Sequence, residues 1–272
     1  MSFFVTSETR ELHKNAVMHN FSFSGVRGYV IEPKAYIRAD RKCVWFMPAW
    51  MILPEDEFIQ DGNLGKLEPR YEGQLLEHEF YANHLLDEGY CLVCAATGIT
   101  LGNSVGTIRF QEFYEILTHD FGIDRKVILL GQSNGALMAT NWAVRFPHQA
   151  ERILYLYPAL DLCSWPGLEK AYEMCGGIPA GYNMSYEEFT TRLWQFNPIE
   201  QASAWAAAGI KILSLHGTAD TLVPFEANTL QFYSRYIAAG GENMSYITLP
   251  GVGHGSGIPV YESREALAFL MK

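Results

Sequence analysis

The sequence has no apolar run long enough to cross a bilayer. A membrane-spanning helix needs about 20 consecutive apolar residues, and the apolar stretches of these 272 residues are short and interrupted. The first residues also lack a basic segment followed by an apolar one, so the sequence predicts no signal peptide. We therefore expect a cytoplasmic protein that has no membrane partner.

Positive charge is scarce, and it is not clustered. Lys and Arg total 20 against 30 Asp and Glu, which gives a formal net charge of −10. Domains that bind nucleic acid usually present a basic stripe or patch, and no run of Lys and Arg occurs here. Nucleic acid is therefore not an expected partner.

Cysteine is also sparse, with five residues that follow no framework spacing. Such a number and spacing are typical of a reducing compartment and not of a disulfide scaffold. Cys91 and Cys94 form a C-x-x-C pattern, but they lie in residues 90–97, an apolar stretch typical of a β-strand. An offset of three places two side chains on opposite faces of a strand, so we expect core cysteines and no metal or redox pair.

Short apolar stretches alternate with helical patterns along the chain. Six stretches are almost continuously apolar, as are strands buried on both faces of a parallel sheet: residues 42–48, 90–97, 126–131, 152–158, 211–216 and 244–249. Residues 22–31 alternate and predict outer antiparallel strands. Helical periodicity lies between the stretches, at residues 71–88, 107–120, 134–146, 225–239 and 260–271. The pattern predicts one α/β domain over residues 1–272, with a mostly parallel central sheet and helices on both faces.

Residues 161–201 are too many for a simple connection, because loops in α/β units usually have ~2–6 residues. They follow the sixth expected strand and carry five large aromatic side chains: Trp165, Tyr172, Tyr182, Tyr186 and Trp194. This aromatic content indicates an ordered segment. We expect a lid-like insert whose rings either stack on a sugar or aryl group of a substrate or pack the insert against the body.

The strongest motif is G-Q-S-N-G at residues 131–135, between an apolar stretch and an Ala-rich helical pattern. In this context G-x-S-x-G forms a sharp turn from strand to helix that exposes the serine hydroxyl. Glycines at both ends of the motif avoid a steric clash at the turn. The helix amino terminus favours a developing negative charge, so Ser133 is the expected nucleophile.

A serine nucleophile needs a base, and the base needs an acid that orients it. His254 lies in the loop after the last expected strand, and Asp220 lies in the loop after the strand before it. Chemistry gathers at the carboxyl ends of such strands. Asp161 follows the preceding strand and is the rival for the acid, but the chain order of Ser133, Asp220 and His254 favours Asp220.

These motifs resemble the esterase and prolyl-oligopeptidase-like branch of the α/β-hydrolases. The resemblance is carried by G-Q-S-N-G at 131–135, H-G-T-A-D-T-L-V-P at 216–224 and G-V-G-H-G at 251–255, and it extends from about Val44 to the carboxyl terminus. It implies an α/β-hydrolase fold, a triad of Ser133, Asp220 and His254, and acyl transfer. Such a mechanism needs no metal and no organic cofactor.

The oxyanion hole should combine two backbone N–H groups. One is expected from Asn134, directly after the nucleophile, and the other from the loop after residues 42–47. That loop reads M-P-A-W at 47–50 and lacks the His-Gly of the family pattern, and Pro48 has no N–H. Ala49 or Trp50 is therefore the second expected donor.

The sequence thus predicts a serine esterase that acts through an acyl-enzyme on a small or carbohydrate-linked short acyl ester. Trp165 and Gln132 are the candidate substrate-binding residues, and the Gly- and Ser-rich residues 97–107 indicate polar recognition. One alternative is a prolyl-oligopeptidase-like peptidase, which the single-domain length and the missing propeller disfavour. Another is a non-catalytic binding protein on the same fold, which an intact triad disfavours. The sequence leaves both a monomer and a homodimer open.

Overall fold

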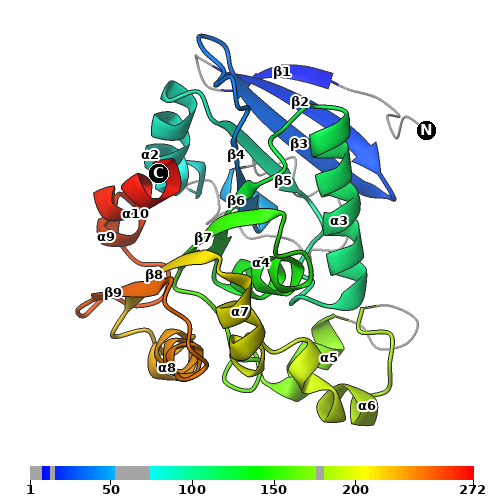
Figure 1. Cartoon of the computed structure of the whole chain (residues 1–272), viewed down its shortest axis with the longest axis vertical. Helices are drawn as coiled ribbons and strands as arrows, with labels where there is room; N and C mark the ends of the chain where they lie inside the picture. Colours follow the sequence, from blue (N-terminus) through cyan, green and yellow to red (C-terminus); the bar gives the residue numbers. More distant parts are fainter. Residues whose placement is uncertain (1–7, 13–15, 53–73, 176–180) are drawn as a thin grey trace.

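The computed structural model describes residues 8–12, 16–52, 74–175 and 181–272. Within these ranges, nine strands form one sheet in the order β1-β2-β3-β5-β4-β6-β7-β8-β9 (Figure 1). Strands β4 to β9 are parallel, whereas β1, β2 and β3 join the edge of β5 in antiparallel pairs. The strands are β1 (Glu8–Leu12), β2 (Ala16–Phe23), β3 (Val26–Pro33), β4 (Cys43–Met47), β5 (Cys91–Ala95), β6 (Val127–Gln132), β7 (Ala150–Leu156), β8 (Lys211–Gly217) and β9 (Met244–Leu249).

Helices cover both faces of this sheet, as the sequence predicts. One face packs on α3 (Ser104–His119), α4 (Asn134–Arg145), α7 (Ala202–Ala208) and α8 (Gln231–Ala238). The other face packs on α2 (Gln74–Asp87), α9 (Ile258–Tyr261) and α10 (Arg264–Met271). Figure 1 shows α2, α9 and α10 together on one side of the strands and α3 and α4 on the other.

Burial on both faces explains why the central strands are almost continuously apolar. In β6, Val127 and Leu129 belong to the cluster under α3 and α4. Ile128 and Leu130 belong to the cluster under α2 and α10, because side chains alternate along a strand. Cys91 and Cys94 likewise fall in opposite clusters and are buried free thiols, which confirms the prediction of core cysteines.

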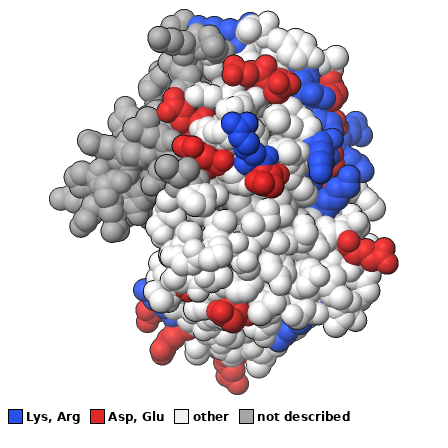
Figure 2. All heavy atoms as spheres, turned by 90° about the vertical axis from the view of Figure 1, so that its left-hand side faces the viewer, with Lys and Arg blue, Asp and Glu red and all other residues white. Residues whose placement is uncertain are grey.

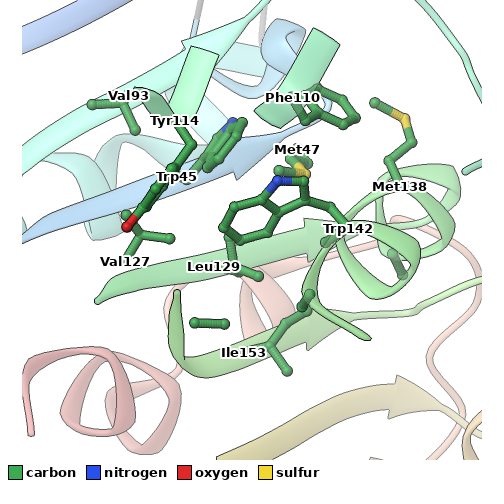
Figure 3. Packing of buried hydrophobic residues seen from close by; sticks show 14 of the residues in the cluster. Trp45, Met47, Val93, Phe110, Tyr114, Val127, Leu129, Met138, Trp142 and Ile153 are labelled. Atoms are coloured by element: carbon green, nitrogen blue, oxygen red, sulfur yellow. The ribbon is translucent and has the colours of Figure 1, made fainter. Parts of the chain in front are cut away.

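Aromatic rings fill the space between β4 and the helices α3 and α4 (Figure 3). The ring centroid of Trp45 lies 5.0 Å from that of Phe113 and 5.1 Å from that of Trp142. Phe113 also stacks on Phe21 and Phe23 of β2, at 5.9 and 5.6 Å. This cluster therefore joins the antiparallel edge of the sheet to its parallel centre.

The outer antiparallel strands expected from residues 22–31 are confirmed as part of the β2–β3 hairpin, whose two turn residues have positive φ, Ser24 at 44° and Gly25 at 75°. Two other elements differ from the sequence-based expectation. β1 was not expected, because its residues, E-T-R-E-L, carry no alternating apolar signal and pair with β2 through the backbone. The expected helix 260–271 is divided into α9 and α10, since the side chain of Ser263 caps α10 by accepting from the N–H of Ala266.

The insert at 161–201 follows β7, which is the seventh of the described strands and not the sixth, because β1 precedes the hairpin. Its described part contains α5 (Leu168–Met174) and α6 (Tyr186–Thr191). Tyr182, Phe189 and Phe196 form its own apolar core with Leu101 and Leu137 of the body. The insert is thus packed on the start of α4.

Charge is distributed unevenly over the molecule. On the face shown in Figure 2, Lys and Arg side chains gather along one side of the upper half. A hollow of about 280 Å³ at the amino ends of β6, β7 and β8 is lined by Lys126, His148 and Lys211, among others. Ser133 follows the carboxyl end of β6, so this hollow and the nucleophile motif lie at opposite edges of the sheet. No helix within the described ranges is long and apolar enough to cross a membrane.

The core cluster at Phe113 should dominate the stability of the domain. Phe113 is fully buried, whereas Ile108 on the same helix is 60% exposed. We expect Phe113→Ala to lower the free energy of unfolding by ~3–5 kcal/mol, because it removes ring contacts and leaves a cavity. Ile108→Ala, the matched control, should change it by less than about 0.5 kcal/mol. Urea unfolding followed by tryptophan fluorescence measures both, and equal effects would contradict this assignment of the core.

Candidate active site

Ser133 lies at a sharp turn between β6 and α4. Its backbone has φ 49° and ψ −120°, in a region that residues other than glycine rarely adopt. The turn is held by three backbone hydrogen bonds: the N–H of Ser133 donates to Leu156 O at 3.0 Å, and its carbonyl accepts from the N–H groups of Ala136 and Ala159. Strained residues persist where the surroundings determine them in this way, and they are common at active sites.

The two glycines of the motif allow close backbone approaches. A Cβ at position 135 would lie 2.0 Å from the carbonyl oxygen of Met47, and a Cβ at position 131 would lie 3.0 Å from Cα of Ala136. Gly135 therefore lets the end of β4 pack directly on the start of α4. This contact brings the segment after β4 next to the nucleophile motif, although the two are about 85 residues apart in the chain.

Ser133, His254 and Asp220 form a continuous hydrogen-bonded set. Ser133 Oγ lies 2.9 Å from His254 Nε2, and His254 Nδ1 lies 2.7 Å from Asp220 Oδ2. Because Nδ1 faces a carboxylate, it carries the ring proton, and Nε2 is left to accept from the serine hydroxyl. The His254 side chain is 19% exposed and that of Asp220 is fully buried, so the base reaches solvent while its partner does not.

The Asp220 carboxylate is held in its ionised form by several donors. Its Oδ1 accepts from the N–H groups of Leu222 and Val223, at 3.0 and 2.8 Å, and its Oδ2 also lies 3.3 Å from His216 Nε2. Burial raises the pKa of Asp220, but hydrogen bonds from His216, His254 and the N–H of Val223 outweigh it and hold the pKa well below its usual value. Asp220 is therefore a carboxylate at neutral pH.

Asp161, the rival acid, has other partners. Its Oδ1 accepts from the N–H of Cys163 and from Asn197 Nδ2, and its Oδ2 accepts from the N–H of Ser164. These bonds close the first turn of the insert, as a side-chain cap does. Of the two carboxylates, Asp220 is the one within hydrogen-bond distance of His254.

The expected oxyanion donors are backbone groups at the starts of two helical turns. Asn134 is the first residue of α4, and Ala49 and Trp50 begin the 3-10 helix η1 (Ala49–Met51). The first N–H groups of a helix have no partner within it; in η1 the first N–H to be paired is that of Met51, which donates to Pro48 O. Ala49 and Trp50 both remain candidates, and the side chain of Trp50 lies outside the described residues.

Two tyrosines that the sequence analysis did not single out support His254. The Tyr157 ring meets the His254 ring edge to face, with centroids 4.7 Å apart. The hydroxyl of Tyr157 lies 2.7 Å from that of Tyr261, which donates to the carbonyl of Gly255 at 3.1 Å. Tyr157 has a positive φ of 37°, which no sequence signal at an apolar strand end indicates.

The candidate substrate-binding residues differ in their surroundings. Trp165 is half-buried and packs on the apolar core of the insert. Gln132 is 5% exposed on the α2 face of β6, and its Oε1 has no hydrogen-bond partner among the described residues. It lies near His78, whose pKa is lowered to about 3 because burial disfavours the charged ring. A substrate contact at Trp165 or Gln132 stays a prediction.

The other aromatic and polar side chains divide between structure and surface. Tyr182 is buried against Phe189 and Phe196, so it packs the insert and does not stack on a substrate. Tyr186 and Trp194 are 40% and 59% exposed. In the polar stretch 97–107, the side chain of Asn103 caps α3 by accepting from the N–H of Gly106. Among the residues described, no group of three His, Cys, Asp or Glu is placed to hold a metal ion.

Solved structures with the same architecture include both hydrolases and peptidases. MPT51 of Mycobacterium tuberculosis is 14% identical, with a TM-score of 0.66 over 97% of this chain and 98% of its own. An S-formylglutathione hydrolase from Agrobacterium tumefaciens is 14% identical, with a TM-score of 0.60 over 98% of this chain and 97% of its own.

A dipeptidyl peptidase 4 from Porphyromonas gingivalis is 13% identical, with a TM-score of 0.63 over 98% of this chain but only 35% of its own length. These similarities establish the α/β-hydrolase fold. No sequence among the curated proteins compared matches this chain.

The model of one protein family matches this sequence directly. The prolyl oligopeptidase family, Peptidase_S9, matches residues 110–272. That segment is more than half of the chain, and it contains Ser133, Asp220 and His254. The chain therefore belongs to the prolyl oligopeptidase family of α/β-hydrolases and is a hydrolytic enzyme.

Proposed function

We propose that this protein is a serine esterase that cleaves short acyl esters through an acyl-enzyme. The observation that carries the proposal is the unbroken hydrogen-bonded path from Ser133 Oγ through His254 to Asp220. This arrangement supplies a nucleophile, a base and a group that orients the base, as nucleophilic acyl transfer requires.

In the proposed reaction, His254 Nε2 takes the hydroxyl proton as Ser133 Oγ attacks the ester carbonyl. The N–H groups of Asn134 and of Ala49 or Trp50 stabilise the oxyanion of the tetrahedral intermediate. His254 then gives its proton to the departing alkoxide, which leaves as the alcohol and completes the acyl-enzyme. Water, activated by the same base, hydrolyses the acyl-enzyme to the free acid and restores Ser133.

Asp220 keeps His254 in the tautomer that this reaction needs. Its buried carboxylate accepts the Nδ1 proton and stabilises the imidazolium that forms in each half-reaction. Because its pKa is held low, Asp220 stays ionised through the catalytic cycle. The side chains and backbone groups named above are sufficient for every step, so the proposed reaction requires no metal or organic cofactor.

Esters are the proposed substrates because of the proteins that this chain resembles over their full lengths. These include the S-formylglutathione hydrolase, and a cold-adapted esterase from an Arctic metagenomic library that is 14% identical, with a TM-score of 0.60 over 98% of its length. The exposed rings of Tyr186 and Trp194 on the insert are suited to stacking on a sugar face. A carbohydrate-linked acyl group, such as an acetyl ester, is therefore the proposed substrate class.

A peptidase activity is the second candidate, and the family match favours it. The same triad cleaves amides when the site can protonate a leaving amine and bind the peptide on either side. The two candidates differ in the group that leaves as the acyl-enzyme forms, an alcohol or an amine, and they share the attack by Ser133 and the hydrolysis of the acyl-enzyme.

The first test compares wild type, Ser133→Ala and Ser234→Ala, the last being an exposed serine on α8 that serves as the control. Substrates are p-nitrophenyl acetate, butyrate and octanoate, acetylated sugars and a proline-linked peptide amide. We expect turnover of the short esters and acetyl sugars, with a loss of at least about 10⁴-fold in kcat for Ser133→Ala and no change for Ser234→Ala.

If the protein cleaves the peptide amide and none of the esters, the peptidase candidate replaces the esterase proposal. Failure of a serine-reactive phosphonate to label Ser133 in wild type would contradict both.

The choice of acid is tested by Asp220→Asn and Asp161→Asn. We expect Asp220→Asn to lower kcat by about 10³- to 10⁴-fold, because an amide no longer selects the right tautomer of His254. Asp161→Asn should keep kcat within about threefold and act on stability alone, because its bonds close a turn. Steady-state kinetics and thermal melts measure the two effects, and the reverse ranking in kcat would make Asp161 the acid.

Stability should depend on the ionisation of Asp220. Its folded-state pKa lies below the usual value of 3.8, so the folded protein binds this proton less readily than the unfolded chain does. The contribution is fully present above pH ~4 and is lost as the pH falls through the lower folded-state pKa. Urea unfolding at pH 6, 4 and 3 should therefore show the stability gap between wild type and Asp220→Asn narrowing below pH ~4. If the difference in free energy of unfolding between wild type and Asp220→Asn stays constant or grows as the pH falls, the carboxylate is not stabilised by its donors.

A further inference from the structure

A second histidine contacts the same oxygen of the triad acid as His254 does. His216 is fully buried at the end of β8, four residues before Asp220. Its Nε2 lies 2.9 Å from the carbonyl oxygen of Val223 and 3.3 Å from Asp220 Oδ2. The same Oδ2 accepts from His254 Nδ1 at 2.7 Å. One carboxylate oxygen is thus placed between two imidazole rings.

The neighbours of His216 determine its tautomer. Nε2 faces a carbonyl and a carboxylate, which only accept, so Nε2 must carry a proton. Nδ1 lies 2.8 Å from Thr229 Oγ1, which in turn lies 2.9 Å from Ser214 Oγ. Either hydroxyl of the Thr229–Ser214 pair can donate, so Nδ1 is paired with Thr229 and every polar atom in this fully buried group has a partner.

Thr229 reaches the ring from a π-helical turn, η5 (Glu226–Leu230), which leads into α8. Single π-helical turns are rare in proteins, and those that occur are often found at functional sites. The neighbouring residue in this turn, Asn228, accepts from the N–H groups of Leu160 and Asp161 through its Oδ1, at 2.8 and 3.1 Å. The π-helical turn therefore supports both the acid loop and the first turn of the insert.

The loop that carries the acid is closed by reciprocal bonds. Asp220 Oδ1 accepts from the N–H of Val223, and the carbonyl of Val223 accepts from His216. His216 in turn reaches Asp220 Oδ2. These contacts form a ring of three residues, and the carboxylate also accepts from the N–H of Leu222 in the same loop and from His254 Nδ1.

We propose that His216 is a positioning residue for the acid, with its donating Nε2–H directed by the Val223 carbonyl and the Asp220 carboxylate and its ring held at Nδ1 by Thr229 of the π-helical turn. The Nε2–H of His216 holds the loop carbonyl and the carboxylate together, so Asp220 Oδ2 points at His254 Nδ1. His216 acts through Asp220 and does not touch the reacting atoms. The inference rests on the proposed function, because it assigns a role to the support of that triad.

The test uses two substitutions at one position. Leu at 216 removes the donor, whereas Gln carries an amide N–H that can reach the place of the ring Nε2. We expect His216→Leu to lower kcat for the short ester by about 10- to 100-fold, the factor for losing one hydrogen bond to a charged group. KM should change little, since His216 does not meet the substrate. His216→Gln should restore kcat to within about fivefold of wild type.

Thr229→Val is the second, independent variant, because it keeps the shape of the side chain and removes the hydroxyl that pairs with His216 Nδ1. It should lower kcat by about 3- to 10-fold, the effect of one neutral hydrogen bond. Thr248→Val, the same substitution at an exposed strand position of β9, is the control, and it should leave kcat unchanged.

Proton NMR provides a readout that loss of stability alone would not change. The Nδ1 proton shared by Asp220 and His254 should give a far-downfield resonance in wild type. We expect this signal to shift or broaden in His216→Leu and Thr229→Val, and to persist in His216→Gln and Thr248→Val. Thermal melts show which variants are folded, and the resonance is recorded well below each melting temperature.

The outcomes distinguish a failure of this inference from a failure of the proposed function. If wild type hydrolyses esters and depends on Ser133, but folded His216→Leu keeps wild-type kcat and the downfield signal, the positioning role is overturned. If His216→Leu does not fold, unchanged kcat and resonance in Thr229→Val overturn it instead. If Ser133→Ala equals wild type, the proposed function fails first, whatever the variants at 216 do.

Discussion

The left-handed backbone at Ser133 is the constraint on which the site depends. A residue with a side chain at φ 49° is stable only where its neighbours fix it, and here both β7 and the segment after it do so through Leu156 and Ala159. The turn also requires that nothing lie between α4 and the end of β4, where Gly135 meets the carbonyl of Met47. A single strained residue thus couples three parallel strands, and the carboxyl edge of the sheet becomes a site because these strands end at one level.

Much of the fold follows from the sequence because burial on two faces leaves a direct signal. The six apolar stretches all became strands of the parallel sheet. The central strands are continuously apolar, since a strand covered by helices on both sides has no polar positions to alternate with, whereas the edge strand β9 is partly exposed. The elements that were missed lack this signal. β1 is held by backbone pairing to β2. The division between α9 and α10 depends on one cap at Ser263, and apolar periodicity alone does not reveal such a cap.

The residues of the candidate site also divide into those that the sequence indicates and those that it does not. Ser133, Asp220 and His254 could be selected because each lies in a loop after a strand whose end the sequence marks, and because the acid and base follow the nucleophile in a known order. Tyr157 could not be given a role, because its importance lies in contacts with residues about 100 positions away in the chain. The role of His216 depends on which atoms its ring contacts around the acid loop, and the motif does not indicate them. A tyrosine at a strand end predicts core packing, and it is the ring contact with His254 and the hydroxyl pair with Tyr261 that show Tyr157 to support His254.

The two supports of His254 differ in physical kind, and this difference bears on how the site works. On the Tyr157 side, a ring contact and a hydroxyl pair restrict the position of the imidazole without fixing its charge. On the Asp220 side, burial makes the carboxylate sensitive to the number of its donors, because a low dielectric strengthens each bond and penalises each missing one. Position and charge of the base are therefore set by separate sets of residues. The Asp220 side needs more hydrogen-bond donors than the Tyr157 side, since an ionised group in the interior is stable only when nearly all of its acceptor sites are filled.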